Sequence, residues 1–343
     1  MDPKYVQRAV DDAVRLLEID SPTGYTQGVT SHLLDALRAM GFAPVRTRKG
    51  SVVCPLGGEG SPLALAAHVD TLGLMVRQIK PDGHLRFARV GGPSLNAVET
   101  ENVSVVTRAG RRYTGVVQAD NASTHVNREL GAQKRDEDHM EILLDELVSS
   151  AQDVRALGID VGDYVLLDPR VRVTSSGFIR SRFLDDKLSA GMLLAFARAV
   201  ADGAVQLTRK TTLFFSVYEE VGHGASSGIP QDTEDLLVVD MGCVGEGLSC
   251  RETQVSICAK DSHGPYDYAM TGELVALAQA RGVDYALDIY PAYGSDAATA
   301  LAAGHDVRFA LIGAGVYASH GYERSHVKGV ENTLRLIEAF AAR

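Results

Sequence analysis

The spacing of apolar residues predicts two helices at the start of the chain. Apolar residues recur at helical spacing from Val6 to Leu17, and this pattern stops at the turn-forming segment 21–24. A second amphipathic segment covers residues 30–40 and ends at Gly41, a residue type that commonly follows a helix. The chain therefore begins with two helices that each bury one face.

A short, almost continuous apolar run at residues 62–67 predicts a strand that is buried on both faces, as in a parallel sheet. An alternation of apolar strands and helices resumes after residue 169. Such alternation predicts an α/β fold with a mostly parallel central sheet and helices on both faces. The later predicted strands cover residues 211–217, 236–239, 283–289 and 309–312, and the later helices cover residues 186–201, 268–280, 295–302 and 330–341.

The chain between residues 71 and 169 has a different pattern. Short apolar segments are separated by glycine-containing turns, which predicts a small β-rich module, and the polar stretch 121–138 is expected to be a loop. We therefore expect an α/β domain in two segments, residues 1–72 and 168–343, interrupted by a β-rich domain at residues 73–167. The predicted strands of that module cover residues 73–79, 85–90, 103–107, 112–118 and 164–167.

The length and net charge of the chain exclude some classes of protein. The chain has 343 residues, enough for a large core, and its 34 basic and 44 acidic side chains give a net charge of −10. This balance argues against a nucleic-acid partner, which requires a basic face.

No apolar run approaches the roughly 20 residues that span a bilayer, and the N-terminus has no signal-peptide core. The four cysteines form no CxxC pair, so we expect reduced thiols in a cytoplasmic protein without a membrane partner.

Acidic and imidazole side chains follow several predicted strands or open a predicted helix. In open α/β sheets, binding sites form beyond the carboxyl ends of the strands, so these residues are expected to converge. Two imidazoles with several carboxylates suit divalent metals such as Zn²⁺, Co²⁺ or Mn²⁺. The positions are His68 with Asp70, Asp185 with Asp186, Glu219 with Glu220, Asp240, and His320.

Each position also has a simpler interpretation. A histidine at a strand end is often structural, and the Asp185-Asp186 pair could cap a helix and interact with its dipole. Glu219 and Glu220 are harder to explain in this way, because adjacent carboxylates that leave a buried strand repel each other and require a positive partner. A metal is the simplest such partner, although an arginine brought there by the fold remains an alternative.

The motifs, in their order, resemble the dinuclear metallo-aminopeptidases of the tetrahedral aminopeptidase and glutamyl aminopeptidase family, which includes deblocking aminopeptidases. The likeness runs from about Ser21 to the closing helix. It implies a zinc-exopeptidase-like catalytic domain, with the β-rich insertion, a PDZ-like or barrel domain, serving dimerisation. The matching segments are His68-Val-Asp70-Thr-Leu-Gly-Leu, Leu184-Asp-Asp-Lys187, Glu219-Glu-Val-Gly222, Val239-Asp-Met-Gly242, the late His320, Gly158-Ile-Asp-Val-Gly-Asp163 and Ser295-Asp-Ala297.

The resemblance also implies a ligand set for two divalent metal ions per subunit, Zn²⁺ or Co²⁺ with Mn²⁺ as a further candidate. His68 and Asp240 would hold the first metal, Glu220 and His320 would hold the second, and Asp185 would bridge the two. Two cations close together strongly acidify a bridging water, which makes a hydroxide nucleophile available at neutral pH.

Two further residues receive roles from the same resemblance. Asp70 would orient the His68 ring, and Glu219 would act as the general base that takes a proton from the water and delivers it to the leaving amine. The expected activity is removal of N-terminal residues from short peptides by a metal-bridged hydroxide. The expected assembly is a homo-oligomer, from a dimer to a dodecamer.

The sequence departs from the family pattern near the expected site. His223 stands where the family commonly has arginine, Thr71 where it commonly has glutamate, and Gly321-Tyr322 follows the last ligand where serine is usual. These changes bear on substrate preference more than on metal binding. His326 is an alternative to His320 as the last ligand, and the position in the motif favours His320.

Three other functions remain open at this point. One is a specialised dipeptide or acyl-amide hydrolase on the same scaffold. Another is an endoglucanase-like glycosidase, since paired carboxylates also hydrolyse glycosides, although the absence of tryptophan argues against a sugar-stacking site. The third is a non-catalytic assembly module, and the complete ligand set together with Glu219 argues against it.

Overall fold

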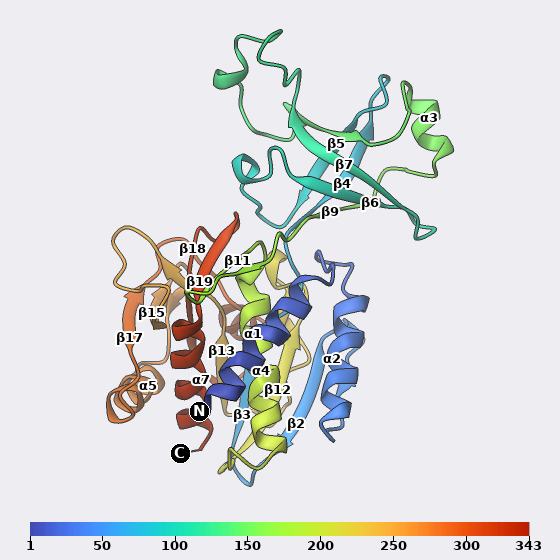
Figure 1. Cartoon of the computed structure of the whole chain (residues 1–343). Coiled ribbons are helices and arrows are strands. Elements are labelled where there is room, and N and C mark those ends of the chain that lie inside the picture. Colours follow the sequence, from blue (N-terminus) through green and yellow to red (C-terminus); the bar gives the residue numbers. More distant parts are fainter. Residues whose placement is uncertain (343) are drawn as a thin grey trace. The chain divides into compact units, whose positions relative to one another are not determined.

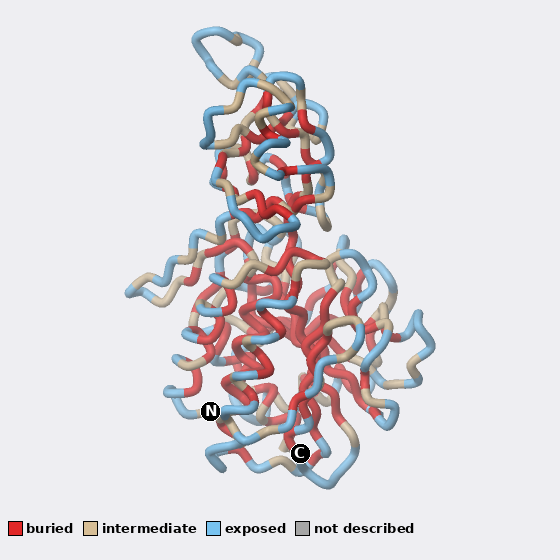
Figure 2. Tube along the Cα trace, turned by 90° about the vertical axis from the view of Figure 1, so that its right-hand side faces the viewer, coloured by how far each residue is buried: buried red, intermediate tan, exposed pale blue. Residues whose placement is uncertain are grey.

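The computed structural model describes residues 1–342, which divide into two compact units. The first unit combines Met1–Thr71 with the chain from Arg170 onward, and the second is Leu72–Pro169. In Figure 1 the second unit is the part that carries β4 to β7 and α3. Each unit has its own buried interior, shown by the red trace in Figure 2.

A mixed sheet of 13 strands forms the centre of the first unit within the described residues. Four adjacent central strands are parallel, in the order β12 (Arg209–Ser216), β3 (Gly60–His68), β13 (Asp235–Val239) and β18 (Arg308–Tyr317). Antiparallel pairs flank them on both sides. The other strands are β1 (Val45–Arg46), β2 (Val52–Gly57), β10 (Arg172–Val173), β11 (Phe178–Ser181), β14 (Gly242–Val244), β15 (Val255–Asp261), β16 (Gly264–Pro265), β17 (Tyr285–Ile289) and β19 (Glu323–His326).

The central strands are buried on both faces, which explains their continuous apolar sequence. Leu63 and Leu65 of β3 belong to one core cluster, whereas Ala64 and Ala66 belong to the cluster on the opposite face. The predicted α/β class, with helices on both faces of the central sheet, is confirmed, whereas the sheet that was predicted to be mostly parallel is mixed, with four parallel strands at its centre. The first cluster contains α1 (Pro3–Leu17), α2 (Gln27–Ala39), α4 (Leu184–Ala201), α5 (Tyr268–Ala280) and α7 (Val327–Ala341), and the second contains α6 (Asp296–Ala302).

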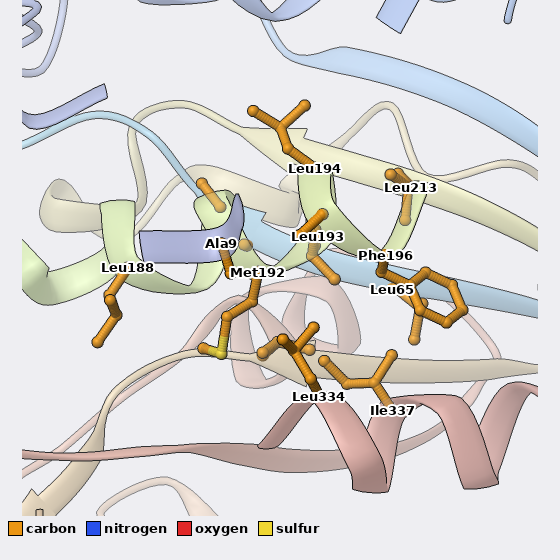
Figure 3. Close-up of a cluster of buried hydrophobic side chains, with 14 of the residues drawn as sticks. Ala9, Leu65, Leu188, Met192, Leu193, Leu194, Phe196, Leu213, Leu334 and Ile337 are labelled. Atoms are coloured by element: carbon orange, nitrogen blue, oxygen red, sulfur yellow. The ribbon is translucent and has the colours of Figure 1, made fainter. Parts of the chain in front are cut away.

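Helix α4 is buried almost all round, because it packs against β3 on one side and against α1 on the other. Figure 3 shows its apolar side chains beside Leu65 of β3 and Leu334 of α7. A Cβ added at Gly191 of α4 would lie 2.7 Å from the carbonyl oxygen of Ala9 in α1. Glycine at this position therefore allows α1 and α4 to pack closely, and this packing fixes the helix whose first turn carries Asp185.

The second unit is a closed barrel whose strands pair antiparallel in the order β4-β5-β8-β7-β6-β9. The predicted β-rich character of this segment is confirmed, and the stretch 121–138 is a loop with one short 3₁₀ turn, Leu130–Ala132. β8 and α3 were not expected from the sequence. The elements are β4 (Gly73–Ile79), β5 (Leu85–Val90), β6 (Asn102–Val106), β7 (Arg112–Ala119), β8 (Met140–Leu144), α3 (Ala151–Ala156) and β9 (Tyr164–Leu167).

The length of the helices and the state of the cysteines bear on two expectations from the sequence. None of the described helices is both long enough and apolar enough to cross a membrane. All four cysteines are free thiols. Burial raises the pKa of Cys54, Cys250 and Cys258 to about 12, so these thiols stay protonated and unreactive at neutral pH.

Candidate metal centre and active site

The parallel strands bring the predicted ligand residues to one edge of the sheet. β3 ends at His68, and its register partner Ser216 ends β12 three residues before Glu219. Asp240 directly follows β13, whose last residue pairs with Ile312 of β18. Because the carboxyl ends of parallel strands meet at the same edge, residues far apart in the sequence become neighbours.

Five of the predicted residues form two groups of potential ligands that share Asp185. The first group is His68, Asp185 and Asp240, and the second is Asp185, Glu220 and His320. In each group the ligand atoms lie within 4.8 Å of one another. Asp185 Oδ1 lies 2.9 Å from His68 Nε2, and its Oδ2 lies 3.7 Å from His320 Nε2. One carboxylate thus faces both imidazoles, each with a different oxygen.

The electrostatics of these groups fit bound cations. Burial, reinforced by neighbouring carboxylates, raises the pKa of Glu220 well above its usual range and that of Asp240 to about 7. Glu220 Oε1 and Asp186 Oδ1 are buried and have no hydrogen-bond partner among the described residues. A divalent cation would relieve both the charge repulsion and the unsatisfied oxygen of Glu220. The donor set, two imidazoles and three carboxylates, suits Zn²⁺, Co²⁺ or Mn²⁺.

The His68 ring is held by the main chain of Asp70. Nδ1 of His68 lies 2.9 Å from the carbonyl oxygen of Asp70 and 3.8 Å from its carboxylate. Asp70 therefore contacts the His68 ring through its carbonyl group. The carboxylate accepts hydrogen bonds from the Thr23 hydroxyl, at 2.6 Å, and from the backbone N–H of Glu219, at 3.1 Å. Asp70 thus links the His68 ring to the Glu219 backbone.

Glu219 opens a 3₁₀ turn, Glu219–Val221, that follows Tyr218 in the left-handed conformation at φ 71°. Its Oε2 lies 3.8 Å from His68 Nε2, and its side chain is only 14% exposed. Burial raises the pKa of Glu219 well above its usual range. Its position at the edge of a cavity, with a pKa raised by burial, suits a group that accepts and returns a proton.

Two residues outside the predicted set brace the loop that follows Glu220. Asp296 accepts a hydrogen bond from the backbone N–H of Ala225, at 2.7 Å, and another from the Ser216 hydroxyl. Lys49 donates to the carbonyl oxygens of His223, at 2.7 Å, and Gly224. Asp296 lies in the Ser295-Asp-Ala297 segment noted in the sequence, whereas no sequence signal marks Lys49.

Glu323 connects two of the ligand segments through their backbones. Its Oε2 accepts a hydrogen bond from the backbone N–H of Asp185, and its Oε1 accepts one from the backbone N–H of His320, both at 3.1 Å. Glu323 is 2% exposed, and burial raises its pKa well above the usual range. In the sequence, only the unusual segment after His320 marks this region, and no pattern predicts a role for Glu323.

The groups open onto a cavity of about 960 Å³. Asp185, Glu219, Glu220, Asp240 and His320 line it, whereas His68 and Asp70 are buried behind its wall. This volume lies at the upper end of the range typical of ligand sites. The centre is therefore accessible to a small organic substrate.

Comparison with known proteins shows which family the chain belongs to. The model of the M42 glutamyl aminopeptidase family matches residues 50–336. The Bacillus subtilis (strain 168) protein named "Putative aminopeptidase YhfE" is 42% identical over 334 residues, which cover 97% of this chain and 96% of that protein. The chain belongs to the M42 glutamyl aminopeptidase family. The resemblance inferred from the motifs is confirmed, and the protein is a hydrolase, an aminopeptidase of a metal-dependent family.

Solved structures share the M42 fold. Aminopeptidase APDkam598 from the archaeon Desulfurococcus kamchatkensis has a TM-score of 0.88 at 23% identity, covering 99% of this chain and 96% of that one. The Pyrococcus horikoshii TET1 peptidase, described as assembling into a tetrahedron or a large octahedral shell, has a TM-score of 0.84 at 20% identity, covering 97% and 99%. Membership of a peptidase family favours the hypothesis of an aminopeptidase over the two alternatives, a glycosidase and a non-catalytic assembly module.

Two other histidines noted in the sequence lie outside the M42 ligand groups. His326 caps α7 by accepting from the backbone N–H of Lys328, at 3.0 Å, and its Nε2 lies 2.9 Å from the carbonyl oxygen of Ser176. The His223 side chain is exposed and does not line the cavity. The geometry therefore favours His320 over His326 as the last ligand.

Proposed function

We propose that this M42 aminopeptidase removes N-terminal residues from short peptides with two divalent metal ions bound by the two ligand groups. The observation that supports this most strongly is the sharing of Asp185, whose two oxygens face His68 and His320. A single carboxylate that belongs to two ligand groups is the arrangement expected for paired cations. The ions are proposed to be Zn²⁺ or Co²⁺, with Mn²⁺ as a further candidate.

Each ligand has a proposed place. His68 and Asp240 would hold one ion, Glu220 and His320 would hold the other, and Asp185 would belong to both sites. When bound, the two ions supply Lewis acidity, which lowers the pKa of water and polarises the peptide carbonyl. The hydrogen bond from the His68 ring to the Asp70 carbonyl fixes which nitrogen, Nε2, faces the ligand group.

Glu219 is the proposed general base. Its Oε2 faces the first ligand group and accepts a proton from the attacking water, then returns that proton to the leaving amine. The Asp70 carboxylate holds the Glu219 backbone through its N–H, so the carboxylate of Glu219 is fixed relative to His68. Asp70 is therefore proposed to position both His68 and Glu219, through its carbonyl oxygen and its carboxylate respectively.

The cavity also accounts for a preference for free N-termini. Four carboxylates line it, from Asp185, Glu219, Glu220 and Asp240. An α-ammonium group is cationic below its pKa near 8 and can donate hydrogen bonds to a carboxylate of this cavity. An acylated N-terminus carries no such charge.

The test is a peptidase assay with metal removal. Leu-Ala-Ala and its N-acetylated form are incubated with the purified protein, with the EDTA-treated protein, and with EDTA-treated protein reloaded with Zn²⁺, Co²⁺ or Mn²⁺. We expect hydrolysis of the free peptide only, loss of activity with EDTA, and recovery on reloading. Preferential cleavage of the acetylated peptide would favour the acyl-amide hydrolase instead, and full activity after complete metal removal would contradict the metal mechanism.

We also propose that the chain forms a homo-oligomer, between a dimer and a dodecamer, through the barrel unit. Support comes from the Pyrococcus horikoshii TET1 peptidase, which shares the fold and is described as assembling into a tetrahedron or a large octahedral shell. Light scattering coupled to size exclusion tests this, and a mass equal to one chain would contradict it. The cytoplasmic location stays a prediction.

A further inference from the structure

We propose that the cavity selects peptides whose N-terminal side chain is uncharged, so that this chain discriminates against N-terminal glutamate and lysine alike. The inference rests on the proposed aminopeptidase function and specifies its substrate class. It comes from the part of the cavity wall that holds no proposed ligand.

That part of the wall is small and neutral. Outside the ligand groups and Glu219, the cavity is lined by glycine, alanine, serine and threonine residues together with Met241, Cys243, Tyr293 and His263. No lysine or arginine of the described chain lines it. Helix α6 contributes Ala298, a threonine and Ala302 to this wall, and none of these side chains carries a charge.

An acidic N-terminal side chain has no cationic partner in this wall. Within this wall, His263 is the one side chain that could carry a positive charge toward an acidic substrate side chain, because the other lining imidazole, His320, belongs to a ligand group. His263 is 63% exposed, and its Nδ1 lies 4.0 Å from the buried carboxylate of Asp261. Any positive charge on this ring is therefore already opposed by Asp261. Desolvating a carboxylate without a partner is costly, so glutamate and aspartate are disfavoured.

A basic N-terminal side chain has no uncommitted acid either. Every carboxylate of the main cavity belongs to the ligand groups or is the proposed base, Glu219. An adjoining cavity of about 450 Å³ shares His263, Ala298 and Ala302 with the main one and adds one carboxylate, Asp261. Asp261 is 2% exposed and already accepts hydrogen bonds from the Tyr266 hydroxyl, at 2.9 Å, and from two backbone N–H groups.

The adjoining cavity extends the neutral surface. Its other lining residues are Gly264, Pro265, Tyr266, Leu301 and Phe309. The Tyr266 hydroxyl is occupied by Asp261 and by Ser295, at 2.8 Å, so this wall presents mainly carbon to an entering side chain. Both cavities therefore favour apolar or neutral polar side chains of varied size.

Two pairs of peptides matched in shape test the inference. Gln-Ala-Ala is compared with Glu-Ala-Ala, and Met-Ala-Ala with Lys-Ala-Ala, using the metal-loaded enzyme at pH 8. We expect kcat/KM to be about 10²-fold higher for the neutral member of each pair. A difference below tenfold in either pair would overturn the inference while leaving the aminopeptidase function intact. Failure to cleave all four peptides would instead contradict the proposed function.

A charge placed in the wall provides a second test. Ala302→Lys adds a cation at an exposed position that lines both cavities, whereas Ala276→Lys adds one at an exposed position of α5 that lines neither. We expect the kcat/KM ratio of the Glu peptide to the Gln peptide to rise at least tenfold in Ala302→Lys and to stay unchanged in Ala276→Lys. An unchanged ratio in a folded Ala302→Lys variant would overturn the assignment of this wall to the N-terminal side chain.

Discussion

The carboxylate of Glu323 accepts a hydrogen bond from the backbone N–H of Asp185 at 3.1 Å, and its other oxygen accepts one from the backbone N–H of His320. Asp185 opens α4, whereas His320 follows β18. Glu323 is buried and holds the backbones of both residues. It can therefore set the spacing of the two proposed ligands, Asp185 and His320.

Glu323→Gln tests this role. An amide would present its NH₂ group to one of the two backbone donors, so one hydrogen bond is lost and the ligand segments shift. We expect metal affinity, measured by competition with a chelator, to weaken about 10- to 100-fold, as for other residues that orient metal ligands. Glu331→Gln, at an exposed position of α7, is the control. Equal affinity in both variants would show that Glu323 does not position the ligands.

Glu219→Gln separates catalysis from metal binding. Removing the base without removing a proposed ligand should lower kcat for Leu-Ala-Ala by about 10²- to 10⁴-fold while metal content stays at the wild-type value. Metal content is measured by mass spectrometry on the same sample. Near-normal turnover would exclude Glu219 as the base, and loss of metal would make it a ligand.

Gly224→Ala probes the loop that carries Glu219 and Glu220. A Cβ at this position would lie 1.9 Å from Asp296 Oδ1, so the loop must move or Asp296 must lose its hydrogen bond to the Ala225 N–H. We expect a melting temperature lower by several degrees and reduced activity. Gly272→Ala is the control, because a Cβ there meets no neighbouring atom in α5, and this change should leave stability unchanged or higher.

The metal-free protein should become less stable as pH rises. The pKa of Asp240 is raised to about 7 in the folded chain, whereas an unfolded aspartate titrates near 4. Between these values the folded state binds more protons than the unfolded state, so its stability decreases from about pH 4 to pH 7. We expect the melting temperature of EDTA-treated protein to fall by several degrees between pH 5.5 and pH 8, and to fall less in Asp240→Asn. Equal slopes in the two proteins would contradict this origin.

Much of the α/β unit was predictable because its central strands are buried on both faces and therefore consist of apolar runs. β3 is the clearest case, since its alternate residues belong to two different cores. β2 was missed because it contains Pro55, which lacks an N–H for strand pairing. In the structure Pro55 lies beside a register shift between β2 and β12, where the hydrogen-bonding pattern is already interrupted.

The candidate ligands were predictable for a related reason. His68 and Asp240 directly follow apolar runs, so the sequence marks them as polar residues at strand ends. Lys49 and Glu323 have no comparable signal, because each acts on backbone atoms that only the tertiary fold brings near. For Asp70, the sequence indicated a link to His68, but the choice between carbonyl and carboxylate depends on backbone geometry that no spacing rule provides.

Metal stoichiometry shows whether Asp185 joins two metal ions. Metal per chain is measured by mass spectrometry for the wild-type protein and for Asp185→Asn, with Asp288→Asn as the control, because Asp288 is buried and accepts two backbone hydrogen bonds away from the ligand groups. We expect two ions per chain in the wild type and in the control, and loss of at least one in Asp185→Asn. Two ions in a folded Asp185→Asn variant, or a single ion in the wild type, would show that Asp185 does not join two ions.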